Sequence, residues 1–104
     1  QIYSGKSAGV PMITLGADGR VSANSNIETA GSLVIRNGSP TIYLQDTDGR
    51  SGMIHQNGNI MHFLRGSGTD SSGWTSTGNG WPLTINMENN DATFGGRIYT
   101  LGNG

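Results

Sequence analysis

The 104-residue chain has no cysteine, few charged residues and no long hydrophobic run. Without cysteine it cannot be stabilised by disulfides. Only 12% of its residues are charged, and six basic against seven acidic side chains give a net charge of −1. These charges are scattered and form no basic stripe along a row of phosphates, so we expect no nucleic-acid partner. No apolar run approaches the ~20 residues of a transmembrane helix, so we expect no membrane insertion.

Residues that build a hydrophobic core are also scarce. Hydrophobic residues make up 33% of the sequence, 18 residues are glycine, and serine, threonine and asparagine are abundant. A small domain is already short of buried surface, and these residues add little apolar area. Disordered chains usually combine such a composition with high charge, which is absent here, so we expect a folded chain. We expect its missing stability to come from oligomerisation.

The chain is expected to be one segment of a longer protein, because it begins at Gln1 rather than at methionine. Its texture changes twice along its length. Residues 1–26 are expected to form a shaft-like N-terminal part and residues 27–104 a distal β-structured part. Within the distal part, the glycine-rich stretch 66–80 is the predicted long loop, and loops of that length are often functional.

The pattern of hydrophobic residues predicts an all-β fold of short strands and hairpins. No stretch repeats apolar residues with helical spacing over three turns, and glycine interrupts nearly every window. Short β-branched and aromatic clusters bounded by turn residues indicate strands instead. The expected strands lie at 10–15, around 21, from 27 onward, and at 33–35, 41–44, 53–56, 59–64, 81–87 and 92–99. Residues 33–35 and 41–44 are expected to pair as a hairpin around 37–40.

The strongest local signal is Asn57-Gly58 between two hydrophobic stretches. Asn-Gly favours a type I′ turn, because both central positions need a positive φ. With these residues as the loop, His55 is expected opposite Ile60 and Met53 opposite His62. One face then carries Met53, His55, Ile60 and His62, and the other carries Ile54, Met61 and Phe63. Hydrophobic residues on both faces predict burial on both sides, as where hairpins from several chains pack together.

Several segments in this order resemble the tail-fibre proteins of tailed bacteriophages. The segments are 40–48, 51–55, 63–65, 80–84 and 92–99. The resemblance implies an elongated, intertwined, parallel homotrimer of β-structure, located in the virion tail fibre, with no cofactor. It also implies recognition of the bacterial surface. Many such fibres are matured by a C-terminal chaperone domain that cleaves itself off, and the resemblance implies a distal segment of that kind.

From this resemblance we expect a receptor-binding protein for host attachment, with an adhesion role at the cell surface. The expected receptor is a lipopolysaccharide glycan or an outer-membrane protein. A purely structural shaft segment without receptor contact is the first alternative. The second is a fragment of a tail spike that degrades polysaccharide.

The predicted loop supplies the candidate receptor-binding residues. Trp74 and Trp81 can stack on the apolar faces of sugar rings, since aromatic side chains give large contact area at low entropic cost. Asp70, Thr75 and Asn79 can form hydrogen bonds with sugar hydroxyls. The alternative is that both tryptophans fill gaps in a glycine-rich trimer core.

The two histidines raise the question of a metal site. In the predicted register His55 and His62 lie diagonally on one face, with Cα atoms about 7–8 Å apart. The sequence has no His-x-His pair, and a two-histidine site without a nearby carboxylate is poor in ligands. We therefore expect packed or hydrogen-bonded histidines and no metal.

Enzymatic activity is not expected either. Asp46 and Asp48 lie close enough in sequence to suggest a glycosidase pair. However, Asp46-Thr47-Asp48-Gly49 is typical of a turn in which aspartate caps its own backbone. The chain has no cysteine nucleophile and no G-x-S-x-G motif.

Overall fold

The computed structural model describes residues 6–7, 10–11 and 13–102, and in these ranges it contains strands and no helix. The prediction of an all-β chain is therefore confirmed. Two compact units follow one another, Gln1–Val34 and Ile35–Gly104. The boundary between them lies after Val34, later than the one expected after residue 26. No helix in the described ranges is long and apolar enough to span a membrane.

The first unit contains two short antiparallel hairpins. Strand β1 (Lys6–Ser7) pairs with β2 (Val10–Pro11), and β3 (Ile13–Leu15) pairs with β4 (Val21–Ala23). The predicted strand at 10–15 corresponds to β2 and β3, although residue 12 lies outside the described residues. The predicted strand from residue 27 onward is wrong, since no strand is formed between β4 and the second unit.

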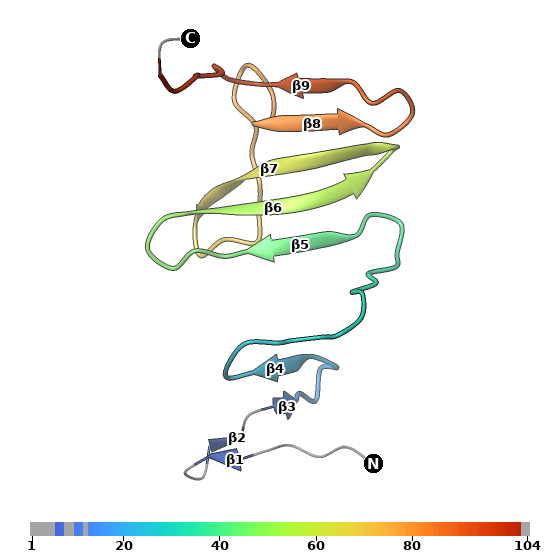
Figure 1. Cartoon of the computed structure of the whole chain (residues 1–104). Helices are drawn as coiled ribbons and strands as arrows, with labels where there is room; N and C mark the ends of the chain where they lie inside the picture. Colours follow the sequence, from blue (N-terminus) through green and yellow to red (C-terminus); the bar gives the residue numbers. More distant parts are fainter. Residues whose placement is uncertain (1–5, 8–9, 12, 103–104) are drawn as a thin grey trace. The chain divides into compact units, whose positions relative to one another are not determined.

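The second unit is a five-stranded antiparallel sheet in which each strand pairs with the next along the chain (Figure 1). The long central hairpin of this meander is made by its second and third strands. The strands are β5 (Thr41–Leu44), β6 (Arg50–Asn57), β7 (Ile60–Thr69), β8 (Leu83–Asn86) and β9 (Ala92–Phe94).

The predicted hairpin between 33–35 and 41–44 is wrong. Strand β5 pairs with β6 instead, and residues 33–35 form no strand. The turn at 46–49 explains the choice, because its side chain–backbone hydrogen bonds close β5 directly onto β6. Asp46 Oδ1 accepts hydrogen bonds from the backbone N–H groups of Asp48 (3.0 Å) and Gly49 (3.1 Å). Leu33 is left 75% exposed.

The β6–β7 hairpin is formed as predicted, but in a different register. Its turn residues are Gly58 and Asn59, with φ of 58° and 65°, rather than Asn57 and Gly58. Asparagine tolerates the left-handed region, so Gly-Asn also satisfies a turn that needs two positive φ values. His55 therefore lies opposite His62, not Ile60, and Met53 lies opposite Leu64, not His62.

This register error leaves the prediction of the two faces intact. Moving the loop by one residue changes the partner of each strand residue by two positions, and side chains alternate with a period of two. Met53, His55, Ile60 and His62 therefore do share one face, opposite Ile54, Met61 and Phe63.

One face of the sheet, here called the covered face, is buried by the chain itself. Its buried residues are Ser51, Met53, His55 and Leu64, with Met53 only 2% exposed. The connection 70–82 between β7 and β8 lies over this face, and in Figure 1 it passes behind the strands. Strand β7 extends to Thr69, so the predicted loop 66–80 begins later than expected.

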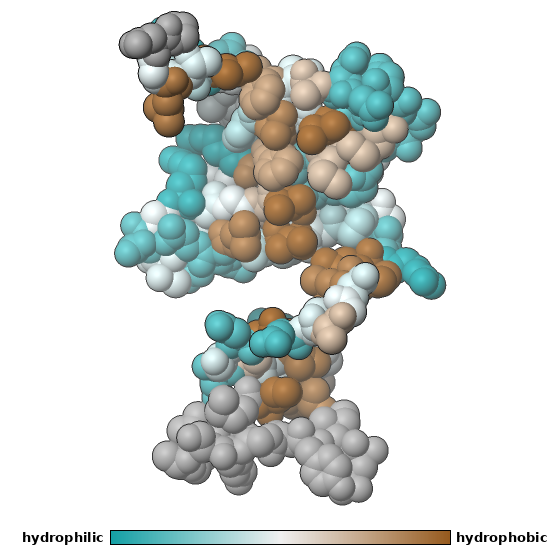
Figure 2. Space-filling view, in the orientation of Figure 1, coloured by the Kyte–Doolittle hydropathy of each residue, from teal (hydrophilic) through white to brown (hydrophobic). Residues whose placement is uncertain are grey.

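The other face, here called the open face, is apolar and largely uncovered. One residue from each strand stands directly opposite its neighbour in a row across the whole sheet: Ile42, Ile54, Phe63, Leu83 and Phe94. A second row adds Met61, Ile85 and Ala92, and Leu44 flanks them. Phe94 is 50% exposed and Leu44 is 58% exposed. Figure 2 shows hydrophobic residues gathered over the five-stranded sheet.

Candidate binding site at one end of the sheet

The connection 70–82 is fastened to the sheet at its start. The backbone N–H of Asp70 donates to the Asp46 carbonyl (2.7 Å), and the backbone N–H of Ser71 donates to Ser51 Oγ (3.0 Å). Asp70 has a φ of 48°, which an aspartate can adopt in a tight turn. These contacts hold the connection against the covered face and place Asp70 beside the β5–β6 turn.

Trp74 lies over the covered face. Its ring centroid is 5.2 Å from that of His55 and 6.5 Å from that of Tyr43, within the range of aromatic contacts. The side chain keeps 39% of its surface exposed. Trp74 therefore has a packing role in the single chain, while its contact with a receptor stays a prediction.

The two histidines are directly opposite one another beneath this connection. Their ring centroids are 5.6 Å apart, which is closer than the diagonal arrangement that we expected. His55 Nδ1 forms a 2.7 Å hydrogen bond with Thr41 Oγ1, whereas the buried Nδ1 of His62 has no hydrogen-bond partner. Across the described residues, no group of three or more histidine, cysteine or acidic side chains is placed to hold a metal ion.

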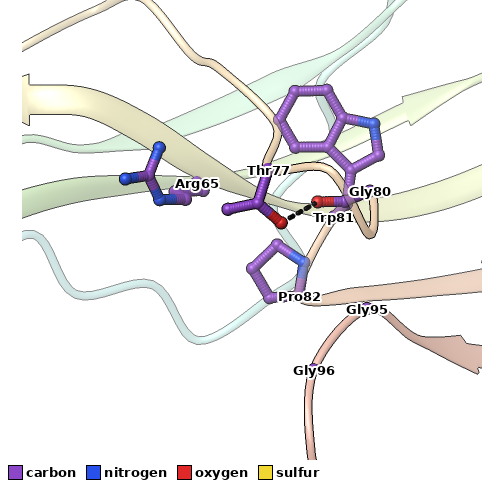
Figure 3. A pocket seen from close by; sticks show the side chains of 7 residues that line it. All are labelled: Arg65, Thr77, Gly80, Trp81, Pro82, Gly95 and Gly96. Carbon is purple, nitrogen blue, oxygen red and sulfur yellow. Dashed lines mark hydrogen bonds between the residues drawn. The ribbon is translucent and has the colours of Figure 1, made fainter.

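A pocket of about 230 Å³ opens where β7, the end of the connection and the segment after β9 meet (Figure 3). Arg65 comes from β7, Thr77 to Pro82 come from the connection, and two glycines follow β9. The lining residues are Arg65, Thr77, Gly80, Trp81, Pro82, Gly95 and Gly96.

A tight turn shapes one wall of the pocket. Thr77 and Gly80 exchange backbone hydrogen bonds of 3.2 Å and 3.0 Å, and Thr77 Oγ1 donates to the Gly80 carbonyl at 3.4 Å. Gly80 has a φ of 96°, a conformation that favours glycine. Asn79 lies within this turn, with its backbone N–H 3.4 Å from Thr77 Oγ1.

The opposite wall depends on a close approach between two backbones. The Gly95 N–H donates to the Pro82 carbonyl at 3.3 Å. A Cβ atom on Gly95 would overlap the Trp81 carbonyl oxygen and lie 3.1 Å from the Asn79 carbonyl oxygen. A Cβ on Gly96 would meet nothing within 4 Å. Gly95 is thus required by contact, whereas Gly96 faces open space.

Arg65 is the charged residue in the pocket lining, and it has no carboxylate partner. Its Nη1 donates to the Thr75 carbonyl at 3.3 Å, and the side chain is half-buried. In the described part of the chain the one ion pair joins Arg20 and Asp18, at 2.7 Å, in the other unit. A guanidinium has five N–H donors, so most of those on Arg65 remain available.

The predicted site residues divide into two groups. Trp81 lines the pocket, and Thr75 and Asn79 flank it through their backbones. Asp70 and Trp74 lie elsewhere on the connection, against the β5–β6 turn and the covered face. Sequence reasoning missed Arg65, Thr77, Pro82, Gly95 and Gly96. The glycine pair directly after a predicted strand was the available signal, since paired glycines often permit close chain approach.

The acidic residues of the β5–β6 turn have a structural role. The Asp48 backbone N–H, followed by further hydrogen bonds within the turn, lowers the pKa of Asp46 below its ordinary value of 3.8. A catalytic acid needs the opposite shift, because it must hold its proton near neutral pH.

Comparison of the chain with protein-family models, curated proteins and solved structures finds no match in any of the three.

Proposed function

We propose that this chain is a segment of a bacteriophage tail fibre that assembles as a homotrimer and attaches the virion to the bacterial surface. The observation that carries the proposal is the open face of the five-stranded sheet. Monomeric soluble proteins rarely leave so continuous an apolar surface in water, and large exposed apolar patches usually mark interaction sites.

Two further copies of the same chain are the proposed cover for this face. The row from Ile42 to Phe94 crosses every strand and contains no charged residue. A net charge of −1 per chain makes repulsion between copies small. The single chain buries only Met53 and Leu64 as hydrophobic core, which is little for a sheet of this size. Association supplies the burial that one chain lacks.

The pocket between Arg65 and Trp81 supports the attachment role. It combines an indole, a guanidinium and a threonine hydroxyl near an exposed end of the sheet. Few precisely placed polar groups within an apolar hollow are typical of small-ligand sites. A shaft segment has no need of such a hollow, so the pocket favours attachment over a purely structural role.

The test is retention of the labelled, purified chain on bacterial cells. The strains compared should carry full-length lipopolysaccharide, truncated lipopolysaccharide, or deletions of major outer-membrane proteins. We expect retention that depends on one of these surface components. A trimer retained by none of the strains of a broad panel would identify a shaft segment instead. Release of oligosaccharide from purified lipopolysaccharide or capsule would support the polysaccharide-degrading alternative.

A further inference from the structure

We infer that the pocket between Arg65 and Trp81 binds a single anionic sugar unit, one that carries a carboxylate or phosphate group. This inference rests on the proposed function, because it names the ligand class of the proposed attachment site. It concerns Arg65, Thr77 and Trp81 together with the glycine wall.

The charge of the ligand follows from Arg65. A half-buried guanidinium normally finds a carboxylate, because desolvating a cation without a partner is costly. Arg65 instead has one hydrogen bond, to the Thr75 carbonyl, and no acidic residue lines the pocket. The planar fork of a guanidinium matches the oxygens of a carboxylate or phosphate in a bidentate arrangement.

The sugar character follows from the other walls. The Trp81 side chain offers a flat apolar surface for the C–H face of a pyranose ring. The Thr77 hydroxyl stands between Arg65 and Gly80 in Figure 3 and can exchange a hydrogen bond with a sugar hydroxyl. Gly96 leaves open space at the mouth, where a neighbouring unit of a chain can pass.

The size of the pocket limits the ligand to about one sugar unit. Its volume of about 230 Å³ lies below the ~300–1,000 Å³ of pockets for drug-sized ligands. Affinity for one unit is therefore expected to be weak, and strong attachment would come from several copies of the site in one assembly.

The experiment is a titration of the full ¹⁵N-labelled chain followed by NMR. Glucuronic acid, glucose 6-phosphate and glucose are the three ligands, and inorganic phosphate is a control anion. We expect the indole N–H of Trp81 and the amides of Gly80 and Gly96 to shift with the two anionic sugars. Preference between them distinguishes a carboxylate from a phosphate ligand. Equal affinity for glucose would show that charge is not recognised and would overturn the inference.

Arg65→Gln is the decisive variant. Charge-assisted hydrogen bonds contribute enough for their loss to weaken binding about tenfold or more. Arg65→Lys keeps the charge without the fork and should fall between Gln and the native residue. Arg36→Gln removes the same charge from an exposed position outside the pocket lining and should change nothing. Unchanged binding by Arg65→Gln, with a native spectrum, would overturn the inference.

The outcomes separate this inference from the proposed function. Retention on cells without binding of either anionic sugar would leave attachment in place and reject the anionic-sugar pocket. Binding of an anionic sugar that Arg65→Gln abolishes, without retention on any cell, would support the pocket and reject attachment by this segment.

Discussion

Gly95 lies so close to the Trp81 backbone carbonyl that a Cβ atom cannot fit between them. This contact joins the segment after β9 to the connection that precedes β8. It also sets the width of the pocket, because both residues line it.

Replacement of Gly95 with alanine should therefore destabilise the protein. The added methyl group must push two backbones apart, and overpacking of this kind costs about 1–3 kcal/mol. Gly96→Ala is the matched control, since its Cβ would meet nothing within 4 Å, and it should stay within about 0.5 kcal/mol of the native chain. Urea unfolding at one fixed protein concentration measures both variants. Equal stability of the two would show that the close approach does not exist.

Replacement of Trp74 with alanine should also lower stability. The ring covers His55 and Tyr43, and its loss opens the covered face to water. Buried Trp→Ala changes cost about 3–5 kcal/mol, and we expect about 2 kcal/mol here because the side chain is partly exposed. Trp74→Phe keeps an aromatic ring over His55 and should lose less. Native stability combined with lost cell retention would instead make Trp74 a receptor contact.

The turn of Asp46 should make stability depend on acidity. Hydrogen bonds from the backbone N–H groups of Asp48 and Gly49 favour the ionised carboxylate and lower its pKa in the folded chain. A lowered folded-state pKa gives stability that is present above the unfolded value and is lost as the pH falls through the folded value. The stability advantage over Asp46→Ala should therefore shrink in acid.

NMR titration of the Asp46 carboxyl carbon checks this directly. Its midpoint should lie below the ordinary value of 3.8. Asp46→Asn, which keeps an acceptor but no titrating group, should lack this site's contribution to the pH dependence. A midpoint at or above 3.8 would contradict the hydrogen bonding described for the turn.

A charge placed on the open face should prevent assembly. Phe94 is half-exposed in one chain, so Phe94→Glu would be tolerated by an isolated sheet. In an apolar interface between copies the same carboxylate would be buried without a partner, at high cost. Tyr99→Glu adds the same charge to an exposed aromatic residue outside the sheet and serves as the control. Light scattering should show dissociation of the first variant alone. Intact assembly by Phe94→Glu would place the interface elsewhere.

Much of the local structure could be predicted because it depends on neighbouring residues. The turn at 46–49 follows from aspartate hydrogen bonding, and the faces of β6 and β7 follow from alternation. The register of that hairpin could not be predicted, because Asn57-Gly58 and Gly58-Asn59 both supply residues that tolerate positive φ. The pattern of side chains was the same for either choice.

Long-range pairing was beyond the reach of local signals. Residues 33–35 have the β-branched composition of a strand, yet β5 pairs with β6 on its far side. The pocket was missed for the same reason. Arg65 and Gly95 lie far apart in sequence, and only the pairing of β7 with β8 and of β8 with β9 brings them together. Trp81 was predicted because tryptophan in a glycine-rich stretch is conspicuous without any fold.

Sedimentation equilibrium of the purified chain tests the central claim most directly. If the open face is covered by two further copies, the folded species should have three times the chain mass of 10.9 kDa. Phe94→Glu should then shift the mass toward that of one chain. A native species of 10.9 kDa that unfolds cooperatively and independently of concentration would contradict assembly through the open face.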